Sequence, residues 1–360
     1  MDRRSFLKNS ALGGTAAAAT ALAAPAYAQG NRTLTLVTTW GRGLAGVHDA
    51  AQRAADTITA LSDGSLTVDL KAAGELVGAF EVFDAVTSGQ ADMYHGADYY
   101  FVGQHPSYAY FTSVPFGMTA QEIMNWYCHG GGQEFHDELG QIFNIKSFLA
   151  GNTGPQSGGW FSKEITGPED FQGLKFRMPG LGGEALGKMG ASVQNLPGAE
   201  VYQALASGAI DGTEWIGPWA DEKAGFQEIT KFYYTAGMHE PGAALSLATN
   251  LDVWESLTPL QQKIIEIASG EAHQWSLAQF MNNNGAALQR LQAGGVKVME
   301  FPESVWDAMG AAAKETLDQY AGDDIYDRIR ASYNESMAAS SSWIQKSEGV
   351  YRAQRDRVMS

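Results

Sequence analysis

The feature that most constrains the fold is a regular alternation of strand-like and helix-like segments near the start of the chain. Residues 33–40 and 65–71 alternate apolar and polar side chains, which predicts two strands. Between them, residues 47–61 carry apolar side chains at helical spacing. A helix over 79–88 and a strand over 91–95 follow. This order of elements predicts a parallel sheet with helices packed on its faces, as in an α/β fold.

A second set of strands and helices begins near Ile145 and predicts a second α/β domain. Strands are expected over 145–150, 159–162, 174–178, 211–216 and 243–249, and helices over 182–190, 198–207, 259–293 and 325–358. A further helix, expected to begin at Thr119, precedes this set. The chain crosses from one half to the other near Ala150 and again near Pro241, which is typical of two lobes joined by a hinge. We therefore predict one domain over residues 29–150 and about 242–275, another over 151–241 and about 276–324, and a long C-terminal helix over 325–360.

The N-terminus has the three parts of a secretory signal. Arg3 and Arg4 precede an apolar, alanine-rich stretch over residues 11–24, and Ala26-Tyr27-Ala28 gives the small-x-small pattern of a cleavage site. The arginine pair points to the Tat route, so we expect export to the periplasm with cleavage after Ala28. The alternative is an uncleaved membrane anchor, but the glycines and alanines make this stretch weakly apolar for a membrane span.

Charge and cysteine content exclude several classes of protein. The formal net charge is −16, so the protein repels nucleic acid and anionic lipid. Cys128 is the only cysteine, which excludes an intrachain disulfide and a thiolate metal cluster within one chain. Because Cys128 follows Trp126 and Tyr127, we expect it to be buried in the core.

Motifs for known enzyme chemistry are weak or missing. The sequence contains no G-x-S-x-G elbow, no H-E-x-x-H and no Walker motif. Gly180-x-Gly182-x-x-Ala185 imitates a dinucleotide fingerprint, but it lies in mid-chain and follows Arg177, which would meet a free anion. We therefore predict no catalytic residues, although a pair of glycosidase carboxylates stays open from sequence.

Four positions favour a binding site because they lie at strand ends or at the crossings between the halves. Arg177 ends a short strand, and Glu214-Trp215 ends the next one. Gln156 lies in a glycine-rich turn, and Glu240 precedes Pro241 at the second crossing. Ligands of open α/β sheets collect beyond the carboxyl ends of the strands, and arginine matches a carboxylate in a bidentate pair.

Residues 171–214 resemble the solute receptors of tripartite ATP-independent periplasmic (TRAP) transporters, the DctP family. The shared elements are Gly173-Leu174-Lys175-Phe176-Arg177, Leu186-Gly187, Glu200-Val201-Tyr202-Gln203-Ala204-Leu205, Gly208-Ala209-Ile210-Asp211-Gly212, and, outside this stretch, residues 74–76 and 114–116. The resemblance implies a two-domain, type II-like periplasmic solute-binding protein with a ligand cleft between the domains.

Within this family the chain is similar to the branch that binds 2-oxo acids such as pyruvate, and to its lactate-binding relatives. The matching segments are Tyr99-Tyr100 and residues 129–132, 151–154, 158–161 and 213–218. The resemblance implies that Arg177 holds the ligand carboxylate. It implies that a cation is bound by Gln156, Glu214, the Trp215 carbonyl and Glu240. Asn152, Tyr99, Tyr100, Gln156 and Trp215 are then the further ligand-binding candidates.

This resemblance implies a receptor, not an enzyme, for a small 2-oxo monocarboxylate. Na⁺ is favoured over Ca²⁺, because only two carboxylates are available and Ca²⁺ usually recruits six to eight oxygens. Alternatives are a lactate receptor with Ca²⁺, and a periplasmic lyase or hydrolase acting on a sugar acid. The expected partner is a membrane permease of small and large integral subunits. The apolar stripe of residues 325–358 predicts a homodimer, or else a helix folded back on its own domain.

Overall fold

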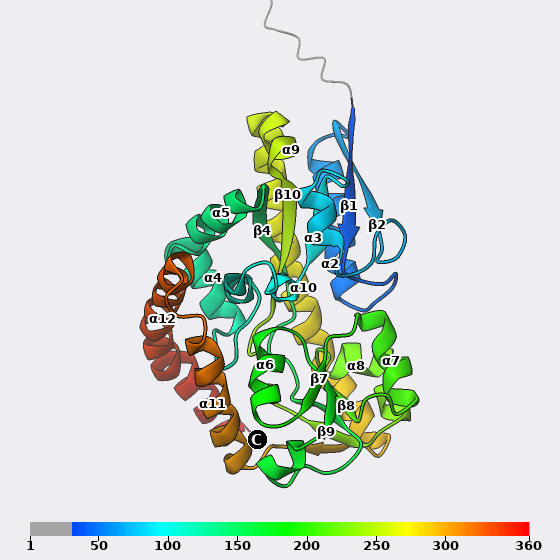
Figure 1. The fold of residues 1–360 in the computed structure, drawn as a ribbon, viewed down its shortest axis with the longest axis vertical. Coiled ribbons are helices and arrows are strands. Elements are labelled where there is room, and N and C mark those ends of the chain that lie inside the picture. Colours follow the sequence, from blue (N-terminus) through cyan, green and yellow to red (C-terminus); the bar gives the residue numbers. More distant parts are fainter. Residues whose placement is uncertain (1–30, 360) are drawn as a thin grey trace, which may run out of the picture.

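The computed structural model describes residues 31–359 and shows two lobes, each built on its own β-sheet (Figure 1). The expected signal peptide, residues 1–28, lies outside the described residues. The first sheet, ordered β2-β1-β3-β10-β4, contains β1 (Arg32–Thr38), β2 (Leu66–Lys71), β3 (Met93–Gly96), β4 (Ile145–Asn152) and β10 (Ala244–Asn250). The second, ordered β11-β9-β5-β8-β6-β7, contains β5 (Gly159–Phe161), β6 (Lys175–Arg177), β7 (Ser192–Gln194), β8 (Gly212–Thr213), β9 (Phe232–Tyr234) and β11 (Lys297–Met299). The predicted α/β class is confirmed.

The first sheet contains the parallel strands that the alternating pattern predicts. β1 pairs in parallel with both β2 and β3. Leu34 and Leu36 of β1 are fully buried and share an apolar cluster with Ile58 of α2 (Val47–Leu61). β10 comes from far along the chain and inserts antiparallel between β3 and β4. The chain therefore returns to the first lobe after it has built most of the second.

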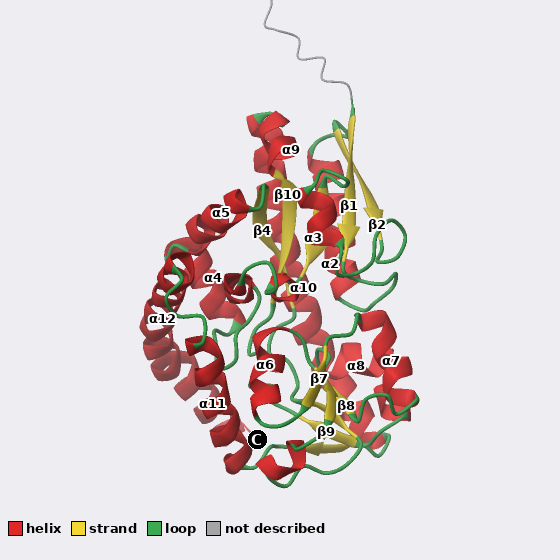
Figure 2. Ribbon diagram, viewed as in Figure 1, coloured by secondary structure: helices red, strands yellow, loops and turns green. Residues whose placement is uncertain are grey.

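Helices cover the sheets and form the flanks of both lobes (Figure 2). The shorter ones are α3 (Val82–Thr87), α4 (Ala120–His129), α5 (Gly132–Ile142), α6 (Gly180–Lys188), α7 (Gly198–Ala206), α8 (Pro218–Ala224) and α9 (Leu251–Ser256), with 3₁₀ turns η1 (Asp98–Phe101), η2 (Pro106–Phe111), η3 (Pro168–Phe171) and η4 (Phe226–Glu228). As expected, α4 begins after Thr119, which forms a capping box with Glu122. Among the described residues, no helix has the length and apolar character needed to cross a membrane.

Three of the connections between the lobes run through β4, β10 and a long helix. β4 leaves the first lobe at Asn152, and β10 re-enters it at Ala244; the two paths are held together where the Thr153 N–H donates to the Ala243 carbonyl at 3.0 Å. The third connection is α10 (Pro259–Ala293), which packs on α2 and β4 in the first lobe and on α8 in the second. The predicted domain boundary near residue 275 falls inside this continuous helix, and the boundaries stay a prediction.

The C-terminal segment folds back along the molecule before it becomes exposed. α11 (Glu303–Asp318) packs on α6, and α12 (Asp324–Ile344) packs on α4, α5 and η2. Ile329 and Tyr333 of α12 are buried, whereas the Trp343 side chain is 70% exposed. A π-helical stretch, η5 (Gln345–Gly349), then leads into α13 (Val350–Met359), which has no buried residue. The helix expected over 325–360 therefore continues through a π-helical turn to residue 359, and its first half packs on the first lobe.

The expectation that Cys128 is buried was wrong. Trp126 and Tyr127 are buried against the core as expected, but Cys128 is exposed. In an α-helix, successive side chains point about 100° apart, so the residue after two buried positions can face solvent.

Candidate functional site

Two neighbouring strand ends of the second sheet bring the predicted arginine and a predicted carboxylate together. β6 ends at Arg177 and pairs in parallel with β8, where Thr213 lies opposite Arg177. The next residue, Glu214, donates its backbone N–H to the Arg177 carbonyl at 3.2 Å. Because ligands of α/β sheets collect beyond the carboxyl ends of strands, this edge is where a small-molecule site is expected.

Arg177 is buried, with only 1% of its side chain exposed. Nε donates to the Leu196 carbonyl at 3.1 Å, Nη1 forms an ion pair with Glu214, and Nη2 lies 3.5 Å from the Tyr100 hydroxyl. The guanidinium also lies over the Trp215 ring, 5.4 Å from its centroid. Burial lowers the pKa of Arg177, but the Glu214 carboxylate raises it, and the net rise in pKa keeps the guanidinium charged. A charged, buried arginine of this kind suits a carboxylate ligand.

Three buried side-chain oxygens around this site have no hydrogen-bond donor among the described residues. They are Gln156 Oε1, Glu214 Oε2 and Glu240 Oε2. Burial raises the pKa of Glu240 well above its usual range, and the nearby charge of Glu214 raises this pKa further. Buried acceptors without donors, together with two close carboxylates, are the oxygen set that a cation such as Na⁺ or Ca²⁺ prefers. These residues therefore fit the predicted metal site.

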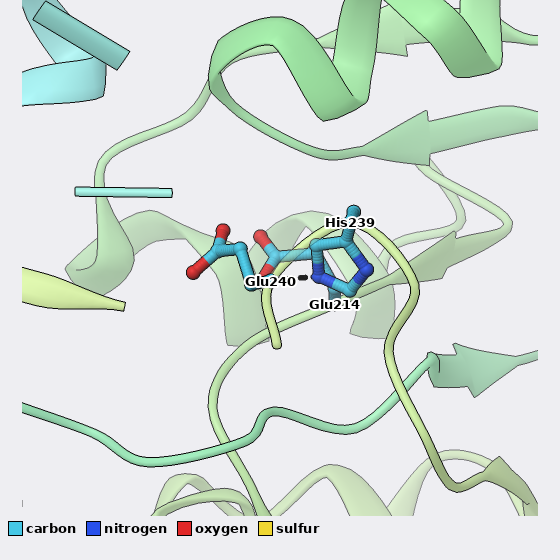
Figure 3. A group of neighbouring side chains, drawn as sticks. All are labelled: Glu214, His239 and Glu240. Carbon is cyan, nitrogen blue, oxygen red and sulfur yellow. Dashed lines mark ion pairs between the residues drawn. The ribbon is translucent and has the colours of Figure 1, made fainter. Parts of the chain in front are cut away.

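One member of this cluster, His239, was not predicted from the sequence. One ligand atom from each of Glu214, His239 and Glu240 lies within 4.8 Å of the others (Figure 3). His239 Nε2 lies 3.6 Å from Glu214 Oε2, and the imidazole is only 3% exposed. His239 directly precedes Glu240 in the sequence, and this adjacency was the only signal available. Only the folded loop between β9 and β10 shows that both side chains approach Glu214.

A small pocket with a cavity volume of about 10 Å³ lies beside this cluster, between the lobes. Its walls come from both lobes and are mostly apolar and aromatic: Trp40, Val47, Tyr99, Tyr100, Thr153, Gln156, Trp215, Ile216, Ala243 and Leu245. Four of the predicted ligand-binding residues are among them, whereas Trp40 was not predicted. Asn152, also predicted, is fully buried, and its Oδ1 accepts the Gly154 N–H at 2.7 Å, so that it shapes the turn below the pocket.

The loop that carries Glu214 and Trp215 is fixed by a buried carboxyl group. Asp221 accepts the backbone N–H groups of Ile216 and Gly217, both at 3.0 Å, and the indole N–H of Trp160 at 2.9 Å. Burial raises the pKa of Asp221 to about 7, and these three hydrogen bonds counteract the rise. On the other side of the loop, the Ile216 carbonyl accepts the Ser157 N–H at 2.9 Å. The position of the loop is thus set by hydrogen bonds that do not involve a ligand.

Comparison with known proteins places this arrangement among solute receptors. Residues 40–323 match the family described as bacterial extracellular solute-binding protein, family 7, or DctP. A monocarboxylate 2-oxoacid-binding periplasmic protein of Nostoc sp. is 40% identical over 289 residues, which cover 80% of this chain and 79% of that protein.

Two solved structures are similar over nearly their full length. A TRAP periplasmic solute-binding protein of Pseudoalteromonas atlantica, with bound sodium and pyruvate, has a TM-score of 0.87 and 38% identity, over 90% of this chain and 99% of that one. A TRAP solute-binding protein of Bordetella bronchiseptica, a dimer with calcium and picolinate, has a TM-score of 0.89 and 31% identity, over 91% and 98%. The predicted two-domain fold and the family resemblance are both confirmed, and the chain belongs to the DctP family of TRAP solute-binding proteins.

Proposed function

We propose that the protein is the periplasmic receptor for a small 2-oxo monocarboxylate such as pyruvate or 2-oxobutyrate, which it binds without transforming it. The Nostoc relative carries a 2-oxoacid-binding name, and the Pseudoalteromonas structure contains pyruvate. The single observation that carries the proposal is the pairing of a buried, charged arginine with buried oxygens that have no donors. The first suits an organic anion and the second suits a cation.

In the proposed complex, Arg177 pairs with the ligand carboxylate. The bound cation is held by Gln156, Glu214, the Trp215 carbonyl and Glu240. The cation, when bound, supplies positive charge for the carboxylate and for the 2-oxo oxygen. Pyruvate and picolinate share a carboxylate with a second donor atom one bond further along, so both can form a five-membered chelate. Tyr99, Tyr100 and Trp40 provide the apolar wall that excludes water and limits the length of the alkyl group.

Two details of this proposal concern which cation is bound, Na⁺ or Ca²⁺, and whether the ligand is a 2-oxo or a 2-hydroxy acid. We favour Na⁺, because the site offers two carboxylates and Ca²⁺ usually recruits six to eight oxygens. A lactate receptor with Ca²⁺ is the second candidate, and the calcium in the Bordetella structure is the observation that favours that ion. A 2-hydroxy acid forms the same five-membered chelate through its hydroxyl oxygen.

Membership of an extracellular solute-binding family supports a location outside the cytoplasmic membrane and a membrane permease as the partner. We propose that the chain is exported by the Tat route, is cleaved after Ala28, and delivers its ligand to a permease of small and large integral subunits. We also propose a homodimer. Its support is the exposed apolar end of the C-terminal segment, where Trp343 and Tyr351 are 70% and 64% exposed, and the dimer in the Bordetella structure.

Calorimetry on chelator-treated protein tests the binding proposal. Pyruvate, 2-oxobutyrate, lactate and propionate are titrated in sodium-free buffer, and then with Na⁺ or Ca²⁺ restored. We expect tight binding of the 2-oxo acids only with a cation, and propionate to bind more than about tenfold more weakly because it lacks the second donor. Equal binding of propionate, or undiminished pyruvate affinity without metal, would contradict the proposal.

The matched variants are Arg177→Met and Arg53→Met. Arg53 lies on α2 in a surface pair with Glu271, so its loss controls for the removal of one positive charge. Loss of a charge-assisted pair in a closed cleft costs about 2–5 kcal/mol, a decrease in affinity of about 30-fold or more. Near-native affinity in Arg177→Met would show that the carboxylate is held elsewhere.

A further inference from the structure

The imidazole of His239 has a polar atom with no hydrogen-bond partner. His239 Nε2 is buried and has no partner within hydrogen-bonding distance among the described residues. The ring also borders a small apolar cavity that contains Phe176, Met178 and Met238. These neighbours offer no strong acceptor. One oxygen from each of the two carboxylates of the cluster described above lies within 4.8 Å of a ring nitrogen of His239.

Two glycines leave the space that this ring occupies. A Cβ atom added at Gly182 would lie 2.8 Å from the His239 Cβ, and one at Gly237 would lie 2.8 Å from its Cε1. Real Cβ atoms do not approach so closely, so the ring occupies space that larger residues at these positions would fill. The two glycines therefore leave room for the ring to lie with Nε2 facing Glu214.

The separation between His239 Nε2 and Glu214 Oε2 matches that of two ligands on one metal ion better than that of a hydrogen-bonded pair. The Nε2–Oε2 distance of 3.6 Å exceeds a normal hydrogen bond. A tetrahedral ion with bonds of about 2.1 Å places its ligand atoms about 3.4 Å apart. In Figure 3 both carboxylates lie on the same side of the imidazole, so one ion can contact all three groups.

We infer that His239 is a third protein ligand, and that the site binds Zn²⁺ and related transition-metal ions in addition to Na⁺ or Ca²⁺. Imidazole nitrogen and carboxylate oxygen are both zinc ligands, and three protein ligands leave the fourth tetrahedral position open. An imidazole contributes little to Na⁺ or Ca²⁺, which take oxygen ligands. The metal ligands expected from the sequence were all oxygen atoms, which do not favour zinc. His239 adds a nitrogen ligand to them. That a 2-oxo acid would occupy the open position rests on the proposed function; the zinc site itself does not.

The alternative role for His239 is to orient Glu214 without touching the metal. Loss of such an outer partner lowers metal affinity by about 10–100-fold, and it does so for every metal that Glu214 holds. A direct nitrogen ligand behaves differently, because its loss lowers the affinity for zinc far more than the affinity for calcium. The ratio of the two effects therefore separates the two roles.

The test measures Zn²⁺ and Ca²⁺ affinity on chelator-treated protein, zinc by competition with a chromophoric chelator and calcium by calorimetry. The variants are His239→Gln, Glu214→Gln, and His129→Gln, which removes an exposed imidazole on α4 as the control. We expect His239→Gln to lose more than about 100-fold in zinc affinity and less than about threefold in calcium affinity. Glu214→Gln should weaken both ions, and His129→Gln should change neither.

A second measurement on the unmodified protein does not depend on how the variants fold. In the Cu²⁺-loaded protein, electron paramagnetic resonance should show coupling to one imidazole nitrogen, and ¹⁵N-histidine labelling should change that splitting. Failure of the wild-type protein to bind zinc, equal losses for both metals in His239→Gln, or a copper signal without nitrogen coupling would each overturn the inference. Loss of pyruvate binding alone would contradict only the proposed function.

Discussion

Replacing Glu240 by glutamine should separate the stability of the protein from its ability to bind a cation. The ligand atoms of Glu214 and Glu240 lie within 4.8 Å of each other, and both side chains are buried. Two unit charges at this distance repel each other by about 3.5 kcal/mol at an effective dielectric constant of about 20. The buried guanidinium of Arg177 offsets part of this repulsion. We therefore expect Glu240→Gln to stabilise the cation-free protein by about 1–3 kcal/mol at neutral pH.

The gain should depend on pH, because burial and Glu214 raise the pKa of Glu240. The folded protein then holds a proton that the unfolded chain has already lost above about pH 4.3. Wild-type stability therefore falls as pH rises from about 4.3 towards the raised pKa, whereas the variant has no such loss. The stabilisation by Glu240→Gln should be close to zero at pH 4.5 and clearly larger at pH 7.5.

Urea unfolding, followed by tryptophan fluorescence in a chelating, sodium-free buffer at both pH values, measures this effect. Glu255→Gln, an exposed position on α9, is the control. Restoring Na⁺ or Ca²⁺ should stabilise the wild-type protein more than the variant, because the variant has lost one ligand. An unchanged or reduced stability of cation-free Glu240→Gln at pH 7.5, or the same gain at both pH values, would refute the reasoning.

Three further predictions rest on other residues. Asp221→Ala leaves three buried donors without an acceptor, so urea unfolding should show a loss of about 3 kcal/mol or more, and pyruvate affinity should fall because the Glu214 loop is no longer fixed. Burial lowers the pKa values of His95 and His273 to about 4, so stability should fall as pH drops from about 6.5 to 4, by up to about 3 kcal/mol per histidine; His95→Gln should flatten that dependence in urea titrations. Deletion of the residues after Ala339 should convert the proposed dimer into a monomer by light scattering, and an unchanged mass would refute the role of that segment.

Long elements with a strong periodicity were predictable from the sequence. The helices over 47–61 and 259–293 have the expected bounds because their apolar spacing extends over several turns. β7, β9 and β11 are three residues each, too short for any periodicity, and they form only because partner strands are present. The strand expected over 211–216 shrinks to two residues for a related reason, since the Glu214 loop turns away towards Asp221.

The candidate site was partly predictable for a similar reason. Arg177 and Glu214 meet because adjacent parallel strands end at the same edge, which the order of elements implies. His239 and Trp40 could not be placed in this way. His239 depends on the path of an irregular loop, and Trp40 depends on how closely the two lobes approach. Neither property leaves a periodic signal in the sequence.

The continuity of α10 determines what kind of joint connects the lobes. This helix has 35 residues, so it is about 52 Å long, and it is packed on both lobes. A change in the angle between the lobes must bend it, which makes it an elastic element and not a free pivot. Gly270 and Gly285, where an added Cβ would meet no atom within 4 Å, are points of local weakness at which curvature can concentrate. Closure of the lobes on a ligand would therefore store part of the binding free energy as curvature of α10, and this strain would favour reopening once the ligand leaves.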